Sequence, residues 1–347
     1  MELGIYSFVE IPVDANNKPL MPPAERMRNL MEEITLADQL GLDVFALGEH
    51  HRPEYLVSSP AVVLAAAAAV TKNIRLSSAV TVISSDDPVR VYQDFATVDL
   101  LSNGRAEIMA GRGSFIESFP LFGYDLQKYD SLFQEKLEML MKIQKTEQLT
   151  WSGRHRPAID DLGIYPRSVQ PEMPIWVAVG GTPESVVRAA VLGLPMAIAI
   201  IGGTPDRFEP FAELYRSTWK NINRDPKGLK LSINSHGFIA EDAQAARDLY
   251  YPPYAEVMGR IGRERNWPPP SRARYDAECS PHGALFVGSP QQIIDKILYE
   301  YELFRHDRFL IQFSVGTMPH DKMMKCIELF GTQVAPVIRK ALQAQDQ

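Results

Sequence analysis

The sequence predicts a (β/α)8 TIM barrel, a closed ring of eight parallel strands with helices outside it. Short β-rich runs recur eight times, helical periodicity follows them, and several runs are almost continuously Val, Ile and Ala. Parallel strands need crossover helices between them, and strands buried on both faces are continuously apolar. An open doubly wound sheet is the alternative fold. No GxGxxG motif follows the first strand, and this argues against that alternative. The 347 residues suit one barrel domain, residues 1–347.

The first four expected strands are apolar runs that each precede a helical stretch. They read LGIYSFV (3–9), DVFAL (43–47), IRLSSAVTV (74–82) and AEIMAG (106–111). Apolar residues at helical spacing follow in AERMRNLMEEITLADQLG, PVRVYQDFATVDLLSNG and SLFQEKLEMLMKIQK. After the fourth unit, residues 146–173 are too long for a simple connection, and we expect an inserted hairpin or loop there.

The last four expected strands complete the barrel. They read PIWVAV (174–179), PMAIAII (195–201), KLSINSHGFI (230–239) and RFLIQF (308–313). A second insertion, residues 250–283, follows the seventh strand and is rich in proline, aromatic residues and arginine. Long insertions of this kind are often lids or subunit contacts, so we expect an ordered segment at the barrel mouth or at a subunit edge.

Composition narrows the class of protein. The formal net charge is −7, the pI is near 5.6 and no dense Lys/Arg run occurs, which argues against nucleic-acid and anionic-membrane partners. The longest apolar stretch, PAVVLAAAAAV, is too short to span a bilayer, and the N-terminus lacks signal-peptide features. Cys279 and Cys326 show no CxxC spacing, as is typical of reduced thiols. We expect a cytoplasmic globular protein.

The motif LGEHH (residues 47–51) places a carboxylate and two imidazoles at the end of the second strand. The C-terminal ends of barrel strands form the active-site face, so the motif should lie at the mouth. Three interpretations are open: a metal site, a proton-transfer site and a hydrogen-bonded strand end. Neighbouring residues of a strand point to opposite faces, so His50 and His51 should not both face the pocket. Since no HExxH or similar ligand spacing occurs either, we expect no metal site.

Three other strand ends carry candidate binding residues. The fourth strand ends in AGRGSF, where glycines flank an arginine that could bind phosphate or only face solvent. The fifth ends in VGGTPESVV, a glycine turn and helix start that could bind phosphate, although GTPD and GSPQQ are similar helix starts. The seventh contains His236, a second mouth residue that could be catalytic or structural. The candidates at the first two are Gly111, Arg112, Gly113, Ser114, Gly180, Gly181 and Thr182.

Several motifs in this order resemble the bacterial luciferase-like flavin monooxygenases. They are LGEHH, SSAVTVISSDDPVRVYQDFATVDLLSNGRAEIMAGRGSF, PLFGYD and WVAVGGTPESVVRAAVLGLPM. The resemblance covers about residues 3–200 and resumes in ALFVGSPQQIIDKI and DRFLIQFSVGTMP. It implies a barrel that binds reduced FMN, or a deazaflavin in some branches, and that usually works as a dimer. Oxygenases of this family receive reduced FMN from a separate NAD(P)H-dependent flavin reductase.

The resemblance also assigns roles to residues. It makes His50 the catalytic base and Arg112 the partner of the flavin phosphate. It places a non-prolyl cis peptide beneath the flavin at Ala79–Val80, with Thr81 next to it. Gly181 and Thr182 stand where luciferase has a glutamate and a serine, and Ser185 where it has a threonine, so the hydroxyls are kept and the carboxylate is missing. Gly111 stands where luciferase has a reactive cysteine, which favours a monooxygenase or reductase relative over a light emitter.

The function that the resemblance implies is oxygen activation. Reduced FMN and O2 would form a flavin hydroperoxide that oxygenates a small organic substrate, with His50 and His236 as candidates for proton transfer. The alternatives are a deazaflavin (F420)-dependent reductase or dehydrogenase on the same barrel, and a non-catalytic flavin-binding protein. We expect a homodimer that meets its flavin reductase transiently.

Overall fold

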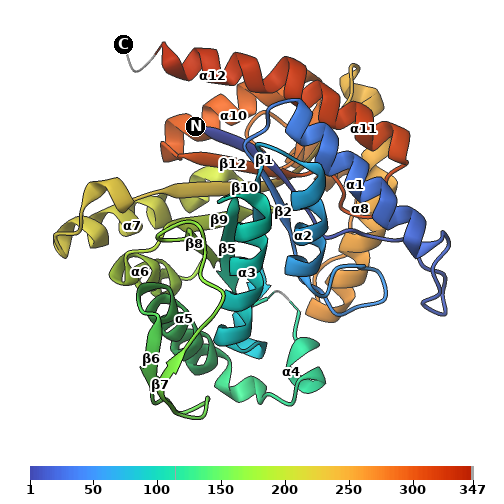
Figure 1. The fold of residues 1–347 in the computed structure, drawn as a ribbon. Helices are drawn as coiled ribbons and strands as arrows, with labels where there is room; N and C mark the ends of the chain where they lie inside the picture. Colours follow the sequence, from blue (N-terminus) through green and yellow to red (C-terminus); the bar gives the residue numbers. More distant parts are fainter. Residues whose placement is uncertain (114, 345–347) are drawn as a thin grey trace.

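Eight parallel strands close into a barrel in the computed structural model, which describes residues 1–113 and 115–344. Around the ring the order is β1, β2, β3, β5, β8, β9, β10 and β12, and β12 pairs with β1. The predicted (β/α)8 barrel is therefore confirmed (Figure 1). The bounds are β1 Glu2–Ser7, β2 Val44–Leu47, β3 Arg75–Ser78, β5 Ala106–Gly111, β8 Ile175–Val179, β9 Met196–Ile200, β10 Leu231–Ile239 and β12 Arg308–Gln312.

Four short strands lie outside this ring. β4 (Thr81–Val82) pairs with β5, and β11 (Phe286–Gly288) pairs with β10. The stretch 74–82, expected as one strand, is divided into β3 and β4 because the chain turns at a cis peptide between Ala79 and Val80. Within residues 146–173, β6 (Gln148–Trp151) and β7 (Ile159–Gly163) form an antiparallel hairpin, which projects beside α5 in Figure 1.

Twelve α-helices connect the strands in the described part of the chain. Five of them begin at a proline, which lacks the N–H that a first helical turn leaves unbonded. The bounds are α1 Pro23–Gln39, α2 Pro60–Val70, α3 Pro88–Ser102, α4 Ser118–Leu121, α5 Tyr129–Lys145, α6 Pro183–Leu192, α7 Glu209–Asn221, α8 Ala243–Arg265, α9 Arg272–Glu278, α10 Pro290–Phe304, α11 His320–Leu329 and α12 Ala335–Gln343.

The main hydrophobic core fills the layer between the strands and the surrounding helices. A smaller cluster, which includes Val44, Met109 and Leu310, fills the inside of the barrel. Gly4 of β1 is required there because a Cβ at this position would lie 2.3 Å from the Val44 carbonyl oxygen. Close packing of this kind makes the barrel interior a core and not a pore.

A buried ion pair fills the N-terminal end of the barrel. Arg308, at the start of β12, is 2% exposed and forms hydrogen bonds with Glu107 of β5 and Glu2 of β1. Its guanidinium also lies 4.3 Å from the centroid of the Trp176 ring on β8. The cavity that is lined by all eight strands or their loops lies at the opposite, C-terminal end.

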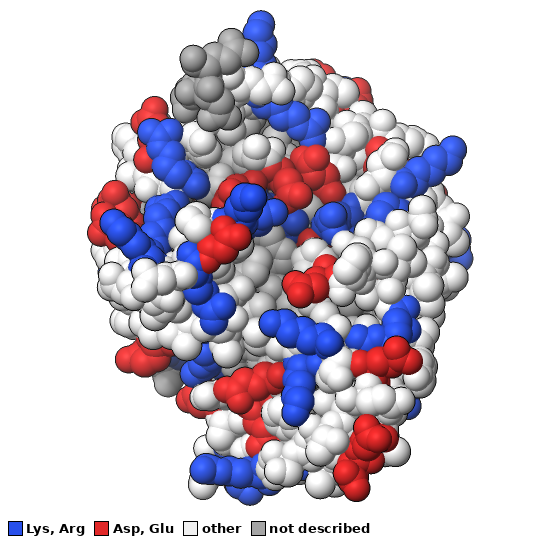
Figure 2. Space-filling model, turned by 60° about the vertical axis from the view of Figure 1, so that its left-hand side comes forward, with Lys and Arg blue, Asp and Glu red and all other residues white. Residues whose placement is uncertain are grey.

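The surface carries mixed charge. On the face drawn in Figure 2, Lys and Arg side chains are interspersed with Asp and Glu side chains and do not gather into one basic area. Across residues 1–113 and 115–344, the helices are all too short or too polar to cross a membrane.

Candidate active site

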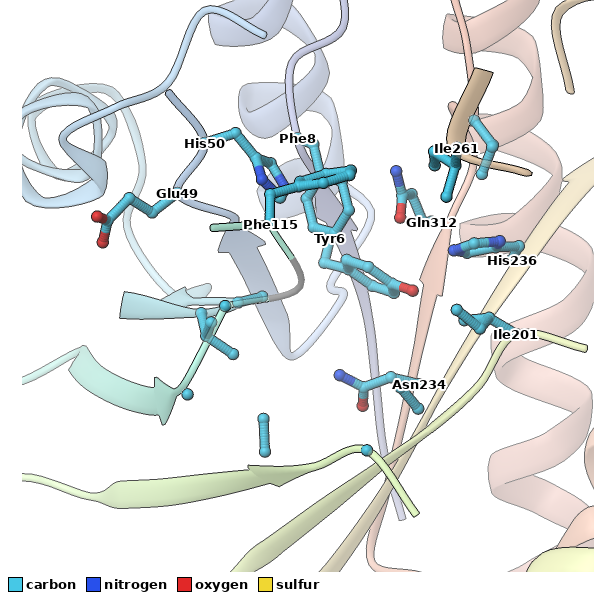
Figure 3. Close-up of a pocket in the computed structure, with 18 of the residues that line it drawn as sticks. Tyr6, Phe8, Glu49, His50, Phe115, Ile201, Asn234, His236, Ile261 and Gln312 are labelled. Atoms are coloured by element: carbon cyan, nitrogen blue, oxygen red, sulfur yellow. The ribbon is translucent and has the colours of Figure 1, made fainter. Parts of the chain in front are cut away.

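The candidate active site is a cavity of about 300 Å³ at the C-terminal ends of the strands. Side chains from every part of the ring line it, beginning with Tyr6 of β1 and ending with Gln312 of β12 (Figure 3). This is the end of a barrel at which catalytic residues lie. Of the residues proposed from the sequence, the cavity is lined by His50, Ala79, Val80, Gly111, Arg112, Gly113, Gly180 and His236.

His50 lies in an aromatic surrounding. Its ring centroid is 4.4 Å from that of Phe8, 4.5 Å from that of Tyr55 and 5.2 Å from that of Phe115. Burial, with smaller effects of His51 and Arg52, lowers the pKa of His50 to about 3. At neutral pH the imidazole is therefore uncharged, and its Nε2 atom has no hydrogen-bond partner among the described residues. An uncharged ring of this kind can accept a proton or a hydrogen bond.

Glu49 and His51 belong to a different contact set. The His51 Nε2 atom lies 2.9 Å from Glu49 Oε1, and Glu49 Oε2 accepts a hydrogen bond from the Val82 backbone N–H at 2.8 Å. The Phe122 ring packs against His51 at 5.1 Å. Figure 3 shows the Glu49 carboxylate pointing away from His50. This pair therefore fixes the loop after β2 to β4, and only His50 of the two histidines contributes to the main cavity.

The cavity wall between β3 and β8 is built from small residues. The cis peptide at Ala79–Val80, predicted from the resemblance, is confirmed. Close packing requires a glycine at position 111, because a Cβ there would lie 2.5 Å from the Val80 side chain. Thr81 is buried behind this wall, and its hydroxyl has no hydrogen-bond partner in the parts of the chain that the structure describes. Ser114, also proposed from the sequence, lies outside the described residues.

A cationic group lies at one edge of the cavity, between β5 and α6. Arg112 donates hydrogen bonds to Asp130 Oδ1 at 2.6 Å and to Ser185 Oγ at 3.1 Å. The Thr182 and Ser185 hydroxyl oxygens are 2.8 Å apart at the start of α6, where Gly181 has a φ of 95° that favours glycine. Arg188, one turn further along α6, lies 4.0 Å from the same Asp130 oxygen. Guanidinium groups, hydroxyls and helix N-termini are the groups with which proteins bind phosphate, so this edge of the cavity could hold an anion.

The opposite wall carries polar residues that the sequence reasoning missed, apart from His236. Tyr6, Glu10, Asn234 and Gln312 line the cavity, and Gln312 donates a hydrogen bond to Glu10 (Figure 3 labels Tyr6, Asn234 and Gln312). Burial lowers the pKa of His236 to about 4 and raises the pKa of Glu10 to about 7. The signal that could have found them is a polar residue at the C-terminal end of an apolar strand.

Helix α8 closes part of the mouth. Its Val257, Met258 and Ile261 side chains line the cavity. Ion pairs join the helix to the loop after β2: Arg52 pairs with Glu264, and Arg260 pairs with Glu54. The segment 250–283, proposed as an insertion, therefore begins inside a helix that covers the site.

Metal ligands do not gather in this site. Within residues 1–113 and 115–344, no group of three or more His, Cys, Asp and Glu side chains is arranged to hold a metal ion. The two histidines of LGEHH also face different surroundings, as described above.

Sequence comparison gives one family. The family model for luciferase-like monooxygenases matches residues 1–307. An uncharacterized protein, y4wF, of Sinorhizobium fredii is 32% identical over 307 residues, covering 85% of this chain and 87% of the relative. The alkanal monooxygenase alpha chain of Aliivibrio fischeri is 24% identical, covering 87% and 90%.

Solved structures share the barrel. The monooxygenase RslO1 of Streptomyces bottropensis has a TM-score of 0.83 at 23% identity, covering 97% of this chain and 99% of that one. The oxygenating constituent of 3,6-diketocamphane monooxygenase from Pseudomonas putida, in complex with FMN, has a TM-score of 0.77 at 18% identity, covering 97% and 98%. An F420-dependent secondary alcohol dehydrogenase has a TM-score of 0.77 at 16% identity, covering 97% and 99%. At these identities the structures establish the shared fold.

Proposed function

The chain belongs to the luciferase-like monooxygenase family, and from this premise we propose that it is an FMN-dependent monooxygenase. Reduced FMN, when bound, supplies the electrons with which one atom of dioxygen enters a small organic substrate while the other leaves as water. One observation carries the proposal: the same cavity joins an anion site at Arg112 to an uncharged, buried imidazole at His50.

The residues present fit a flavin mononucleotide. Arg112 and Arg188 would hold its phosphate together with the hydroxyls of Thr182 and Ser185 and the N–H groups that begin α6. The small wall would accept a planar ring, because side chains larger than those present would fill it. The wall and its glycine turns consist of Ala79, Val80, Thr81, Gly111, Gly113, Gly180 and Gly181.

His50 would act as a proton acceptor. Its pKa of about 3 keeps the imidazole uncharged at neutral pH, so the Nε2 lone pair can accept a hydrogen bond from a reacting group. Negative charge that develops on the reacting group beside the ring would raise this pKa and favour transfer of the proton. The rings of Phe8, Tyr55 and Phe115 around it exclude water from the reacting atoms. His236, on the other wall, is the second candidate for proton transfer.

An F420-dependent reductase or dehydrogenase is the second candidate function. Gly180 and Gly181 favour it, because the turn lacks the carboxylate that luciferase has there. Structural similarity to an F420-dependent dehydrogenase is compatible with it as well. The difference is the fate of the electrons, which pass to dioxygen in the first function and to or from an organic substrate in the second.

The deciding experiment compares the two cofactors. We expect the purified chain to bind reduced FMN more tightly than reduced F420. When oxygen is mixed with the reduced-FMN complex in a stopped-flow instrument, the absorbance should pass through a state different from both oxidised and reduced FMN. Selective binding of F420 with no oxygen-dependent phase would replace the monooxygenase proposal by the second candidate.

We also propose a homodimer formed through α2 and α3. The two helices pack together, and α2 reads PAVVLAAAAAV, without a single charged residue. Val62 of α2 is 70% exposed and Leu101 of α3 is 59% exposed, so apolar side chains remain uncovered on this face. Val62→Glu combined with Leu101→Glu should give a monomer in light scattering, and an unchanged mass would rule out this face.

The reduced FMN would come from a separate NAD(P)H-dependent flavin reductase that meets this protein transiently. Turnover should then need an added reductase when NADH is the electron source, and should need none when FMN is reduced photochemically. Turnover with NADH and FMN alone would contradict this proposal.

A further inference from the structure

Gln312 occupies a defined place on the cavity wall away from the small-residue side. It is the last residue of β12 and is 1% exposed. It pairs with His236 of the neighbouring strand β10, and Figure 3 shows the two side chains near each other. Its side chain therefore belongs to the part of the cavity that the flavin-binding residues leave for a substrate.

The orientation of the Gln312 amide is fixed by two acceptors. Its Nε2 atom donates to Glu10 Oε1 at 2.7 Å and to the Ser314 backbone oxygen at 2.7 Å. A backbone carbonyl oxygen can only accept, so the amide group that faces it must be the NH2 group. An NH2 group has two protons, and both are used in these bonds.

The cluster also holds Glu10 in place. The second carboxylate oxygen of Glu10 accepts a hydrogen bond from the Ser314 hydroxyl at 2.7 Å. Glu10 lies just after β1, and both of its partners lie at the end of β12, so the cluster joins two neighbouring strands. The carboxylate and the amide cannot rotate independently of each other.

One atom of this cluster remains unused. The Gln312 Oε1 atom is buried and has no hydrogen-bond partner anywhere in residues 1–113 and 115–344. A buried acceptor without a partner is unfavourable, and a bound molecule that supplies a donor removes that cost. The polar side chains of Asn234 and His236 line the same wall, and apolar or aromatic residues such as Phe8 and Ile261 complete the lining around them.

We propose that Gln312 is a specificity-determining residue that selects an apolar substrate bearing a hydroxyl or N–H group, whose proton its Oε1 atom accepts. This inference rests on the proposed function in taking the cavity as a substrate site. Glu10 and Ser314 are positioning residues, because they hold the amide with its oxygen toward the substrate. A site built to accept a hydrogen bond rejects isosteric molecules that lack the donor.

Two isosteric pairs of probes test the inference in the full chain, with and without saturating FMN. Indole carries an N–H where benzofuran has an oxygen, and 4-methylphenol carries a hydroxyl where 4-fluorotoluene has a fluorine. Titration calorimetry should show the donor of each pair bound about tenfold more tightly than its isostere, which corresponds to one hydrogen bond to a buried acceptor. Equal affinities, or no binding of either donor, would overturn the inference.

Variants locate the effect at Gln312. Gln312→Met should abolish the preference, whereas Ile261→Val should weaken both members of each pair equally. Glu10→Gln should keep the preference, because its side-chain oxygen can still accept from Gln312 and its NH2 group can donate to the Ser314 hydroxyl. A preference that survives in a folded Gln312→Met protein would overturn the inference. If that variant does not fold, the wild-type and Glu10→Gln ratios decide.

The role of Gln312 and the monooxygenase function can be refuted separately. The probe measurements need neither turnover nor reduced flavin, so a preference for the donors would stand even if FMN did not bind. Conversely, oxygen-dependent oxidation of bound reduced FMN together with equal affinities for the isosteres would uphold the monooxygenase and refute the role of Gln312.

Discussion

Two substitutions at the proposed phosphate site around Arg112 should change FMN affinity in opposite directions. Arg112→Ala removes a guanidinium that we propose for the flavin phosphate. Asp130→Asn instead removes an anion that occupies the same guanidinium at 2.6 Å. A phosphate that binds Arg112 has to replace this carboxylate or share the guanidinium with it. The first change should therefore weaken FMN binding, and the second should strengthen it.

The expected changes in FMN affinity depend on how strong each charged interaction is and on how exposed its side chains are. A charged hydrogen bond contributes about 1.5–3 kcal/mol, so Arg112→Ala should weaken FMN binding roughly 10- to 100-fold. The Asp130 side chain is 68% exposed, and exposed ion pairs contribute about 0–1 kcal/mol. Asp130→Asn should therefore tighten FMN binding by at most about fivefold.

Riboflavin is the matched ligand, because it has the same ring and no phosphate. Fluorescence titration at constant ionic strength should show riboflavin affinity unchanged in both variants. Arg339→Ala serves as the control variant, because Arg339 pairs with Asp43 at the start of β2, away from the mouth. Equal losses for FMN and riboflavin in Arg112→Ala, or weaker FMN binding in Asp130→Asn, would refute the phosphate assignment.

Three further predictions concern other parts of the molecule. His50→Ala should lower turnover by about 10²–10⁴ with little change in flavin affinity. His51→Ala should instead lower the melting temperature, because His51 forms a hydrogen bond with Glu49. The reverse pattern would show that His50 is not the base. Arg52→Ala should speed protease cleavage in the C-terminal half of α8, because it removes the ion pair with Glu264. An unchanged cleavage rate would show that this ion pair does not hold the helix in place. Burial lowers the pKa of His306 to about 3. The unfolded chain binds a proton there below about pH 6.5 and the folded chain does not, so stability is lost as pH falls. Between pH 7 and 5 the wild type should lose about 2 kcal/mol more unfolding free energy than His306→Leu in urea titrations; equal losses would refute the shift.

The sequence by itself determined the barrel and the location of its mouth. Strand and helix periodicity depends on near neighbours in the chain, so all eight ring strands could be found from residue patterns. The start of α6 at Thr182–Pro183 follows from local capping preferences in the same way. The cis peptide at Ala79–Val80 was predicted from the family resemblance, since periodicity gave no sign of it and suggested one continuous strand.

Tertiary structure decided the chemistry of the site. Glu10 and Gln312 are 302 residues apart and become partners only because β12 closes the barrel against β1. The depressed pKa of His50 depends on burial by Phe8, Tyr55 and Phe115, which come from three separate loops. Local patterns specify which residues form each strand, whereas hydrogen bonding, burial and charge at the mouth depend on which strand ends the closed barrel brings together.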